Sequence, residues 1–282
     1  EMEIPFPPKG SPERYRLTAD YGEAVYSSIQ AGNPKATWVM QGWMFGFQRD
    51  IWDYETLKAL VSRVPDDRML LLDLAVDYNK HFWHSQVNWE FYRGYFNKPW
   101  VYSVIPNMGG KTGLTGVLEF YANGRIEALH SPDRGRLAGY GMAPEGIENN
   151  EVIYELVADG GWTSGSIDLD KWLEDYSVCR YGLTTDNITA FWNGLRKSVY
   201  GSFTDHPRYN WQFRPGRVGK GSIQADAHFY KGIECLAEAI PDLGRSPLFR
   251  ADMLEMAAHY LGGKMELLIQ AAAQTSLAGD TT

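Results

Sequence analysis

The chain has 282 residues, of which 44% are hydrophobic and 14% aromatic, and this is enough apolar mass for one large domain or two. Its formal net charge of -8 argues against nucleic acid or an anionic membrane surface as a partner, because both attract basic patches. The sequence holds no run of 18 apolar residues, so it predicts no membrane-spanning helix.

The first half of the chain alternates apolar runs with helical spacings. In chain order, the pattern predicts a helix over 20–31, a strand over 37–45, a helix over 54–63, strands over 68–76 and 100–107, a helical or mixed connection over 118–129, and a strand over 136–142. Near-continuous apolar strands separated by helices indicate an α/β fold whose parallel sheet has both faces covered.

From about residue 150 the pattern is all helical. Asn149 or Asn150 is a candidate cap for the first of these helices. Apolar stripes then follow at 152–157, 169–176, 188–199, 229–240 and 254–261, and a long loop over 201–222 interrupts them. We expect a break near 163–167, which gives two domains, 1–165 and 166–282.

The first of these domains contains four β/α units, which is half of an eightfold barrel. The second reads as the beginning of an all-helical domain. Because four parallel strands leave two open edges, we expect the chain to be an internal piece of a longer protein.

Cysteine and histidine give little support for a metal site. Cys179 and Cys235 each fall in a predicted helix and are expected to be free, buried thiols. His81 and His84 are close in sequence, but no third ligand accompanies them.

In a barrel of this kind the active site forms at the carboxyl ends of the strands. That rule selects Trp43, the pair Asp73 and Asp77, Asn107 and Glu145. Trp43 is either a platform for a sugar ring or a core residue. Asp73 and Asp77 either lie in the site or pair with Lys or Arg. Asn107 either approaches a ligand or belongs to the turn that ends a strand.

Glu145 stands in the segment AGYGMAPEGIENNEV, between a predicted strand and a predicted helix. A carboxylate held there is suited to act as a nucleophile or a general base. The alternative is a Glu near a helix start, where it complements the helix dipole. Hydrolysis of a glycosidic bond needs a second carboxylate. Glu1 is a candidate, although a chain terminus by itself favours a frayed residue.

The motifs WVMQGWMF, LLLDL, NMGGKTGLTG, GMAPEGIENNEVIYEL and RYG together resemble glycoside hydrolase family 89, the α-N-acetylglucosaminidases. The resemblance extends from Glu1 to roughly residue 261. It implies a (β/α)8 catalytic barrel followed by an all-helical domain, of which this chain would hold the second half of the barrel and the start of the helical part.

The resemblance also implies a retaining double displacement by two glutamates. Glu145 falls on the nucleophile and Glu1 on the acid/base, while Trp43 falls on a residue that lines the sugar pocket. The expected partner is a glycan with a terminal α-linked N-acetylglucosamine, and no cofactor is needed. A secreted or periplasmic location is implied for a bacterial protein, and a lysosomal one for eukaryotic relatives.

The chain departs from the family pattern at 106–111, where a His and an Asn of the family loop are replaced. This departure leaves open a related glycosidase for another α-linked sugar. A rival from a different class is a non-catalytic carbohydrate-binding or scaffold protein, against which the presence of both Glu1 and Glu145 argues.

Overall fold

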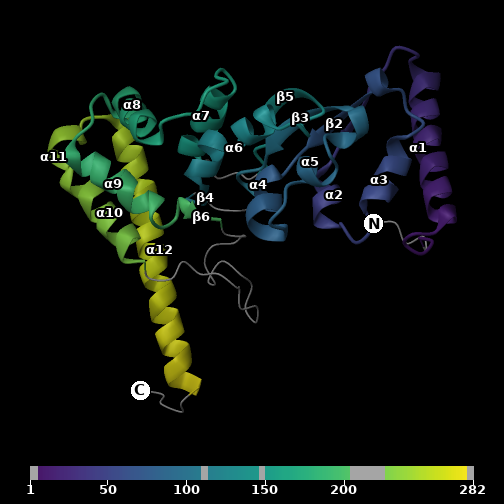
Figure 1. Ribbon diagram of the computed structural model, residues 1–282. Coiled ribbons are helices and arrows are strands. Elements are labelled where there is room, and N and C mark those ends of the chain that lie inside the picture. Colours follow the sequence, from purple (N-terminus) through teal and green to yellow (C-terminus); the bar gives the residue numbers. More distant parts are fainter. Residues whose placement is uncertain (1–5, 109–113, 146–149, 204–225, 278–282) are drawn as a thin grey trace. The chain divides into compact units, whose positions relative to one another are not determined.

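The computed structural model describes residues 6–108, 114–145, 150–203 and 226–277 (Figure 1). Its contacts divide the chain into two compact units. The first unit contains the described residues up to Ile105, with 124–143 and 161–164. The second contains 106–123, 144–160 and the described residues from Gly165 onward.

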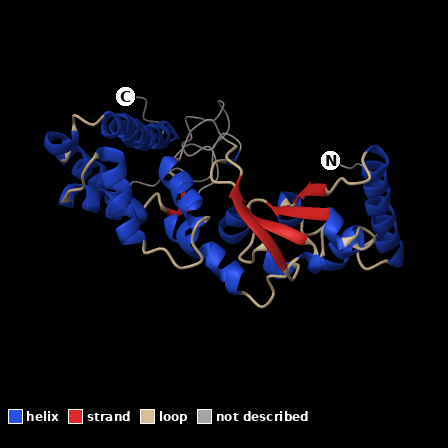
Figure 2. Cartoon of the chain, turned by 90° about the horizontal axis from the view of Figure 1, so that it is seen from above, coloured by secondary structure: helices blue, strands red, loops and turns tan. Residues whose placement is uncertain are grey.

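The first unit is built on a parallel sheet with the strand order β1-β2-β3-β5. Its strands, shown in red in Figure 2, are β1 Trp38–Gln41, β2 Met69–Asp73, β3 Pro99–Val104 and β5 Arg136–Met142. The predicted parallel sheet is confirmed, and β5 has the predicted ends. A shift of register between Trp100 and Val101 is the irregularity that the ladder of β3 and β5 contains.

The prediction that both faces of the sheet are covered is wrong for β1 and β2. In β2, Met69, Leu71 and Asp73 are buried, whereas the residues between them are half-buried. In β1 the same alternation leaves Val39 54% exposed. One face of these two strands is therefore packed by helices, and the other carries apolar side chains in partial contact with solvent.

Helix α1 (Pro12–Gly32) packs against α3 (Tyr54–Val61) beside the sheet. Ser11 caps α1 by accepting from the N–H of Arg14, and Pro12 suits the first helical position. Arg14 is buried and its Nε donates to Thr56 Oγ1 of α3 at 3.0 Å. This polar link explains why α1 extends further than the predicted 20–31, since its first turns lack an apolar stripe.

Short elements fill the connections of the first unit. They are α2 Trp43–Phe47, the 3-10 helix η1 Asp66–Arg68, α4 Val76–Tyr78, the π-helix η2 Asn79–Trp83, α5 Asn88–Phe91 and the 3-10 helix η3 Tyr95–Asn97. The predicted strand over 37–45 thus ends at Gln41, because the chain turns into α2. An apolar run does not by itself distinguish a buried strand from a buried helix.

The second unit combines helices with a small antiparallel pair, β4 Gly116–Val117 and β6 Gly201–Ser202. Its helices are α7 Glu151–Gly160, α8 Leu169–Tyr181, α9 Asp186–Arg196, α10 Ala227–Glu238, α11 Ile240–Leu243 and α12 Pro247–Leu277. Helix α6 (Leu118–His130) begins in this unit and ends in the first one. Helices predominate in the described residues after 150, as the pattern predicts, and the short strand β6 departs from that pattern.

A buried ion pair joins α8 to α12 within the second unit. Arg180 donates from Nε and Nη2 to the two carboxylate oxygens of Asp252 at 2.6 and 2.7 Å. Tyr181 donates its hydroxyl to the same carboxylate at 2.8 Å. The RYG motif therefore supplies two of the groups that fix α12 in place.

Two predictions about the helical part are wrong. Cys235 is free and buried as expected, but the free thiol of Cys179 is on the exposed side of α8. Leu254 and Leu261, which were expected to belong to one inward stripe, are 75% and 64% exposed. The residues 204–222 of the predicted long loop lie outside the described residues.

No helix within the described ranges combines the length and the apolar character that a membrane crossing requires.

Candidate functional site

The carboxyl ends of β1, β2, β3 and β5 lie at one edge of the sheet, because the strands are parallel and adjacent. The ladder continues for one residue past two of these ends. The N–H of Gly42 donates to Leu72 O at 2.8 Å, and the N–H of Ala143 donates to Val104 O at 2.9 Å. The residues that leave the strands at this edge are therefore held in register.

Trp43 follows β1 directly and opens α2. Its side chain is half-buried, and its ring lies 5.9 Å from the ring of Phe47, which is itself exposed. Phe45, the buried residue of the same short helix, anchors it in the core. The structure thus places Trp43 at a strand end with part of its indole accessible. A core residue would be fully buried, so this exposure favours the sugar-platform alternative.

Asp73 ends β2 and is fully buried on the helix-covered face of the sheet. Asn88 Nδ2 donates to its carboxylate at 3.4 Å, and the hydroxyl of Tyr95 and the backbone of Trp89 also favour its charged form. Burial raises the pKa of the Asp73 carboxyl to about 7, and these polar groups only partly oppose the rise. Groups from α5 and η3 surround this carboxyl, so the geometry favours a structural role for it.

Asp77 lies in α4, just after the left-handed residue Ala75, whose φ is 64°. Its Oδ1 accepts the N–H of Tyr78 and the N–H of Ile105, both at 3.1 Å. Because Ile105 follows β3, this buried carboxylate ties the segment after β2 to the end of β3. Asp77 thereby helps to fix the backbone at this end of the sheet.

Asn107 and Glu145 belong to the second unit. Asn107 is fully buried in the turn that follows β3. Glu145 is exposed, follows Pro144, and does not belong to a helix. Since α7 begins only at Glu151, the alternative that Glu145 complements a helix dipole is not supported.

Glu1, the second carboxylate, lies outside the described residues. The distance between Glu1 and Glu145 therefore stays a prediction.

The two histidines take separate roles. His84 Nε2 is 2.6 Å from Gly46 O. Burial, assisted by the neighbouring Lys80, lowers the pKa of His81 to about 4. Within the described residues, His, Cys, Asp and Glu do not gather in threes at a point where a metal ion would bind.

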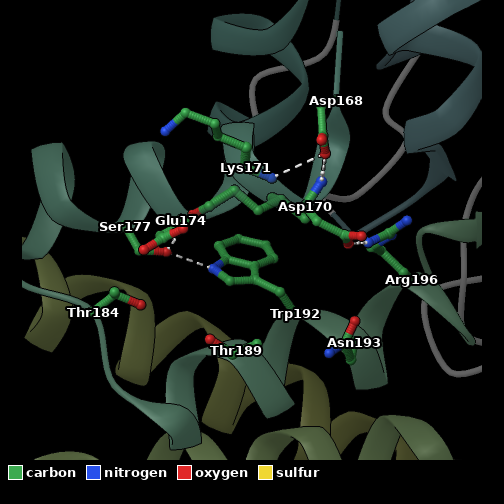
Figure 3. A pocket seen from close by; sticks show the side chains of 11 residues that line it. Asp168, Asp170, Lys171, Glu174, Ser177, Thr184, Thr189, Trp192, Asn193 and Arg196 are labelled. Carbon is green, nitrogen blue, oxygen red and sulfur yellow. Dashed lines mark hydrogen bonds and ion pairs between the residues drawn. The ribbon is translucent and has the colours of Figure 1, made fainter.

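A pocket of about 560 Å³ lies between α8 and α9 of the second unit (Figure 3). The indole of Trp192 lies at its centre, and its Nε1–H donates to Ser177 Oγ at 2.9 Å. Arg196 on its rim is paired with Asp170. Sequence patterns assign Trp192 to a core stripe, so they do not reveal this pocket. None of the strand-end candidates lines it.

The chain matches two parts of one known protein family. Residues 6–164 match the alpha-N-acetylglucosaminidase (NAGLU) TIM-barrel domain, and residues 172–282 match the alpha-N-acetylglucosaminidase C-terminal domain. Human alpha-N-acetylglucosaminidase is 33% identical over 239 residues, which are 83% of this chain and 31% of the human protein.

The fold is also similar to solved structures. A family 89 glycoside hydrolase from Clostridium perfringens, in complex with PUGNAc, has a TM-score of 0.77 and 22% identity, over 93% of this chain and 29% of that one. A form of that organism's enzyme with two glutamates changed to glutamine, in complex with its substrate GlcNAc-alpha-1,4-galactose, has a TM-score of 0.76 and 21% identity, with the same coverage. The chain spans about a third of the length of these relatives.

Proposed function

Because the chain belongs to the alpha-N-acetylglucosaminidase family, we propose that it supplies part of the active site of a retaining exo-glycoside hydrolase. This enzyme would release terminal α-linked N-acetylglucosamine from glycans. The observation that carries the proposal is that Glu145 follows the carboxyl end of β5 in the chain, inside the part that matches the family's TIM-barrel domain.

In the proposed architecture, residues 1–165 are the second half of a (β/α)8 barrel and residues 166–282 begin an all-helical domain. The strand order β1-β2-β3-β5, with helical segments between the strands, supports the barrel part. The partly exposed face of β1 and β2 would then be the inner face of the barrel, which opposite strands normally fill.

The chemistry requires two carboxyl groups with different roles. Glu1 in its acid form protonates the glycosidic oxygen while Glu145 attacks the anomeric carbon, so that the leaving alcohol departs and a glycosyl-enzyme ester forms. Glu1 then takes a proton from water, and that water displaces Glu145 from the anomeric carbon. Each displacement inverts the centre, so the product keeps the α configuration. These steps need no metal or organic cofactor.

The two substituted glutamates of the Clostridium perfringens enzyme, which holds its substrate in that form, support a pair of carboxylates of this kind. Trp43 is proposed to line the sugar pocket, and its half-buried indole at a strand end supports that role. Asn107, Asp73 and Asp77 are proposed as further substrate-binding residues. For Asp73 and Asp77, full burial supports action through the shape of the carboxyl edge of the sheet.

The test uses the protein encoded by the complete reading frame and an aryl α-N-acetylglucosaminide as substrate. Glu145→Gln removes the nucleophile, so kcat should fall by about four orders of magnitude or more. Proton NMR of the first sugar released by the parent should show the α anomer. Glu238→Gln, which removes the same charge from an exposed position of α10, is the matched control and should keep the parent rate. Ordinary turnover by Glu145→Gln would rule out the nucleophile assignment.

A second glycosidase specificity is proposed as the alternative because the chain departs from the family pattern at 106–111. A panel of aryl α-glycosides that differ at the 2-substituent decides between them, since an acetamido preference predicts the highest kcat/KM for N-acetylglucosamine. Binding of such sugars without any turnover would instead support a carbohydrate-binding or scaffold protein. The family membership also supports export from the cell, and a fractionation of the source cells would test that location.

A further inference from the structure

Asn150 stands at the junction between the segment that follows β5 and helix α7, and only 2% of it is exposed. Its carbonyl accepts from the N–H of Tyr154 at 2.9 Å, so it occupies the N-cap position of α7. An Asn at this position commonly caps the helix through its side chain as well. Here, two segments far away in the sequence bind that side chain.

The two polar atoms of the Asn150 amide have different partners. Its Nδ2 donates to Thr115 O at 3.0 Å, and its Oδ1 accepts from the hydroxyl of Tyr200 at 2.8 Å. The backbone carbonyl can only accept, so the orientation of the amide is fixed. Thr115 and Tyr200 are both buried as well, with 0% and 4% exposed. The amide therefore links the segments that contain Thr115, Asn150 and Tyr200, at a point that is buried from solvent.

The partners of Asn150 flank the small antiparallel pair. Thr115 precedes β4 and Tyr200 precedes β6, and Leu118 N–H donates to Tyr200 O at 3.1 Å. Gly116, with a φ of +120°, lies against α7 so closely that a Cβ there would be 2.7 Å from Ile153 Cδ1. The pair β4–β6 and the first turn of α7 thus form one packed body, and Asn150 lies at its polar centre.

Asn107 and Glu145 belong to the same unit as this body. Along the chain, Asn107 is followed by Thr115 and Glu145 is followed by Asn150, so each of them precedes a residue of the body. We propose that Asn150 is a positioning residue, which fixes the chain after Asn107 and after Glu145 and thereby the placement of Glu145 at the reacting sugar. The inference rests on the proposed function of Glu145.

The proposal requires a side chain that both donates and accepts. Leucine has a similar volume but makes neither hydrogen bond. Aspartate keeps the shape but presents an oxygen to the Thr115 carbonyl, and it regains a donor only when it is protonated. These two substitutions therefore separate packing from hydrogen bonding.

The test measures kcat and KM for Asn150→Leu and Asn150→Asp in the protein encoded by the complete reading frame, at temperatures where each variant is folded. Displacement of the nucleophile should lower kcat of Asn150→Leu by about 10- to 100-fold, with a smaller change in KM. For Asn150→Asp, the ratio of its kcat to that of the parent should fall as pH rises, because the ionised carboxylate repels the Thr115 carbonyl. The ratio for Asn150→Leu should not depend on pH.

The matched control is Asn123→Asp. The Asn123 amide accepts from Ile167 N–H at 2.9 Å and donates to Ile167 O at 3.3 Å, so the substitution breaks a pairing of the same kind elsewhere in the second unit. This control should keep the kcat and the pH profile of the parent. An equal loss of kcat with the same pH dependence in Asn123→Asp would overturn the positioning role, as would a kcat of Asn150→Leu equal to that of the parent.

A readout without activity separates this inference from the proposed function. Hydrogen exchange is measured on the 282-residue chain, at the amides of residues 115–118 and 151–154. Asn150→Leu should speed exchange in both segments together, whereas Asn123→Asp should leave both at the parent rates. Unchanged exchange in Asn150→Leu would overturn the role of Asn150 even if the enzyme is active. Faster exchange in both segments, together with a protein from the complete reading frame that hydrolyses no glycoside, would support the role of Asn150 and reject the assignment of Glu145.

Discussion

Asp73 shows how a single buried carboxyl links burial to stability. At low pH its side chain is protonated in both the folded and the unfolded chain. Burial raises the pKa of the folded state to about 7, from the ordinary value of 3.8. Between these two values the unfolded chain has released a proton that the folded chain still holds, so the free energy of unfolding falls as pH rises. Above pH 7 the full destabilising effect is present.

Asp73→Asn removes this titration and keeps the size of the side chain. Relative to the parent, the variant should therefore gain stability as pH rises from about 4.5 to about 8, by roughly 4 kcal/mol at most. Urea unfolding of the 282-residue chain at both pH values measures the difference. Asp50→Asn, at an exposed position, is the control and should follow the parent. Parallel pH profiles for Asp73→Asn and the parent would contradict the raised pKa.

Candidate residues for the site could be selected from the sequence by their position at the end of a predicted strand. Trp43, Asp73, Asn107 and Glu145 could be selected because each ends or follows an apolar run. The partners of these residues could not be predicted, since they come from separate segments. Asn150 illustrates the limit: its sequence context suggests a helix cap, but Thr115 and Tyr200 bind its amide.

At the scale of elements, the contact between α1 and α3 depends on a residue without a side chain. A Cβ at Gly22 would lie 2.0 Å from Leu60 O, which is backbone of α3 and cannot rotate away. Gly22→Ala should therefore push the two helices apart and lower the free energy of unfolding by about 1–3 kcal/mol. Urea unfolding of the chain measures this loss.

Gly32→Ala in the same helix is the matched control. No heavy atom lies within 4 Å of a Cβ built at Gly32. Because alanine favours helix over glycine, this variant should be equal to the parent or up to about 1 kcal/mol more stable. If Gly22→Ala were as stable as Gly32→Ala, the close approach of α1 and α3 would not hold.

Most elements could be predicted from periodicity, and their ends could not. The strand β5 has the predicted limits, because Arg136 and Met142 bound a clear apolar run. Helix α1 starts earlier than predicted, since its first turns are held by the cap at Ser11 and by buried Arg14. The pair β4–β6 joins residues 116–117 to 201–202, and no local pattern reports so distant a pairing.

At the scale of the whole molecule, the exposed face of the sheet and the proposed activity have one explanation. Val39 of β1 is 54% exposed. In a closed barrel, the side chains of the opposite strands would cover this face. The chain also spans about a third of the length of the relatives that it matches. In the proposed architecture, the sugar would contact strand ends from both halves of the barrel.

This explanation predicts that the 282-residue chain binds and hydrolyses α-N-acetylglucosaminides poorly, even when it is folded. Glu145 and its proposed partner Glu1 are both in the chain, but a retaining mechanism also needs their carboxyl groups about 5–5.5 Å apart and the remaining strand ends to orient the sugar. Release of the aryl group should therefore be undetectable with the chain alone and measurable with the protein encoded by the complete reading frame. Circular dichroism and a cooperative urea transition establish that the chain is folded in the same assay. Turnover by the chain at a rate close to that of the longer protein would show that these strands already form a complete pocket, and the half-barrel interpretation would then be wrong.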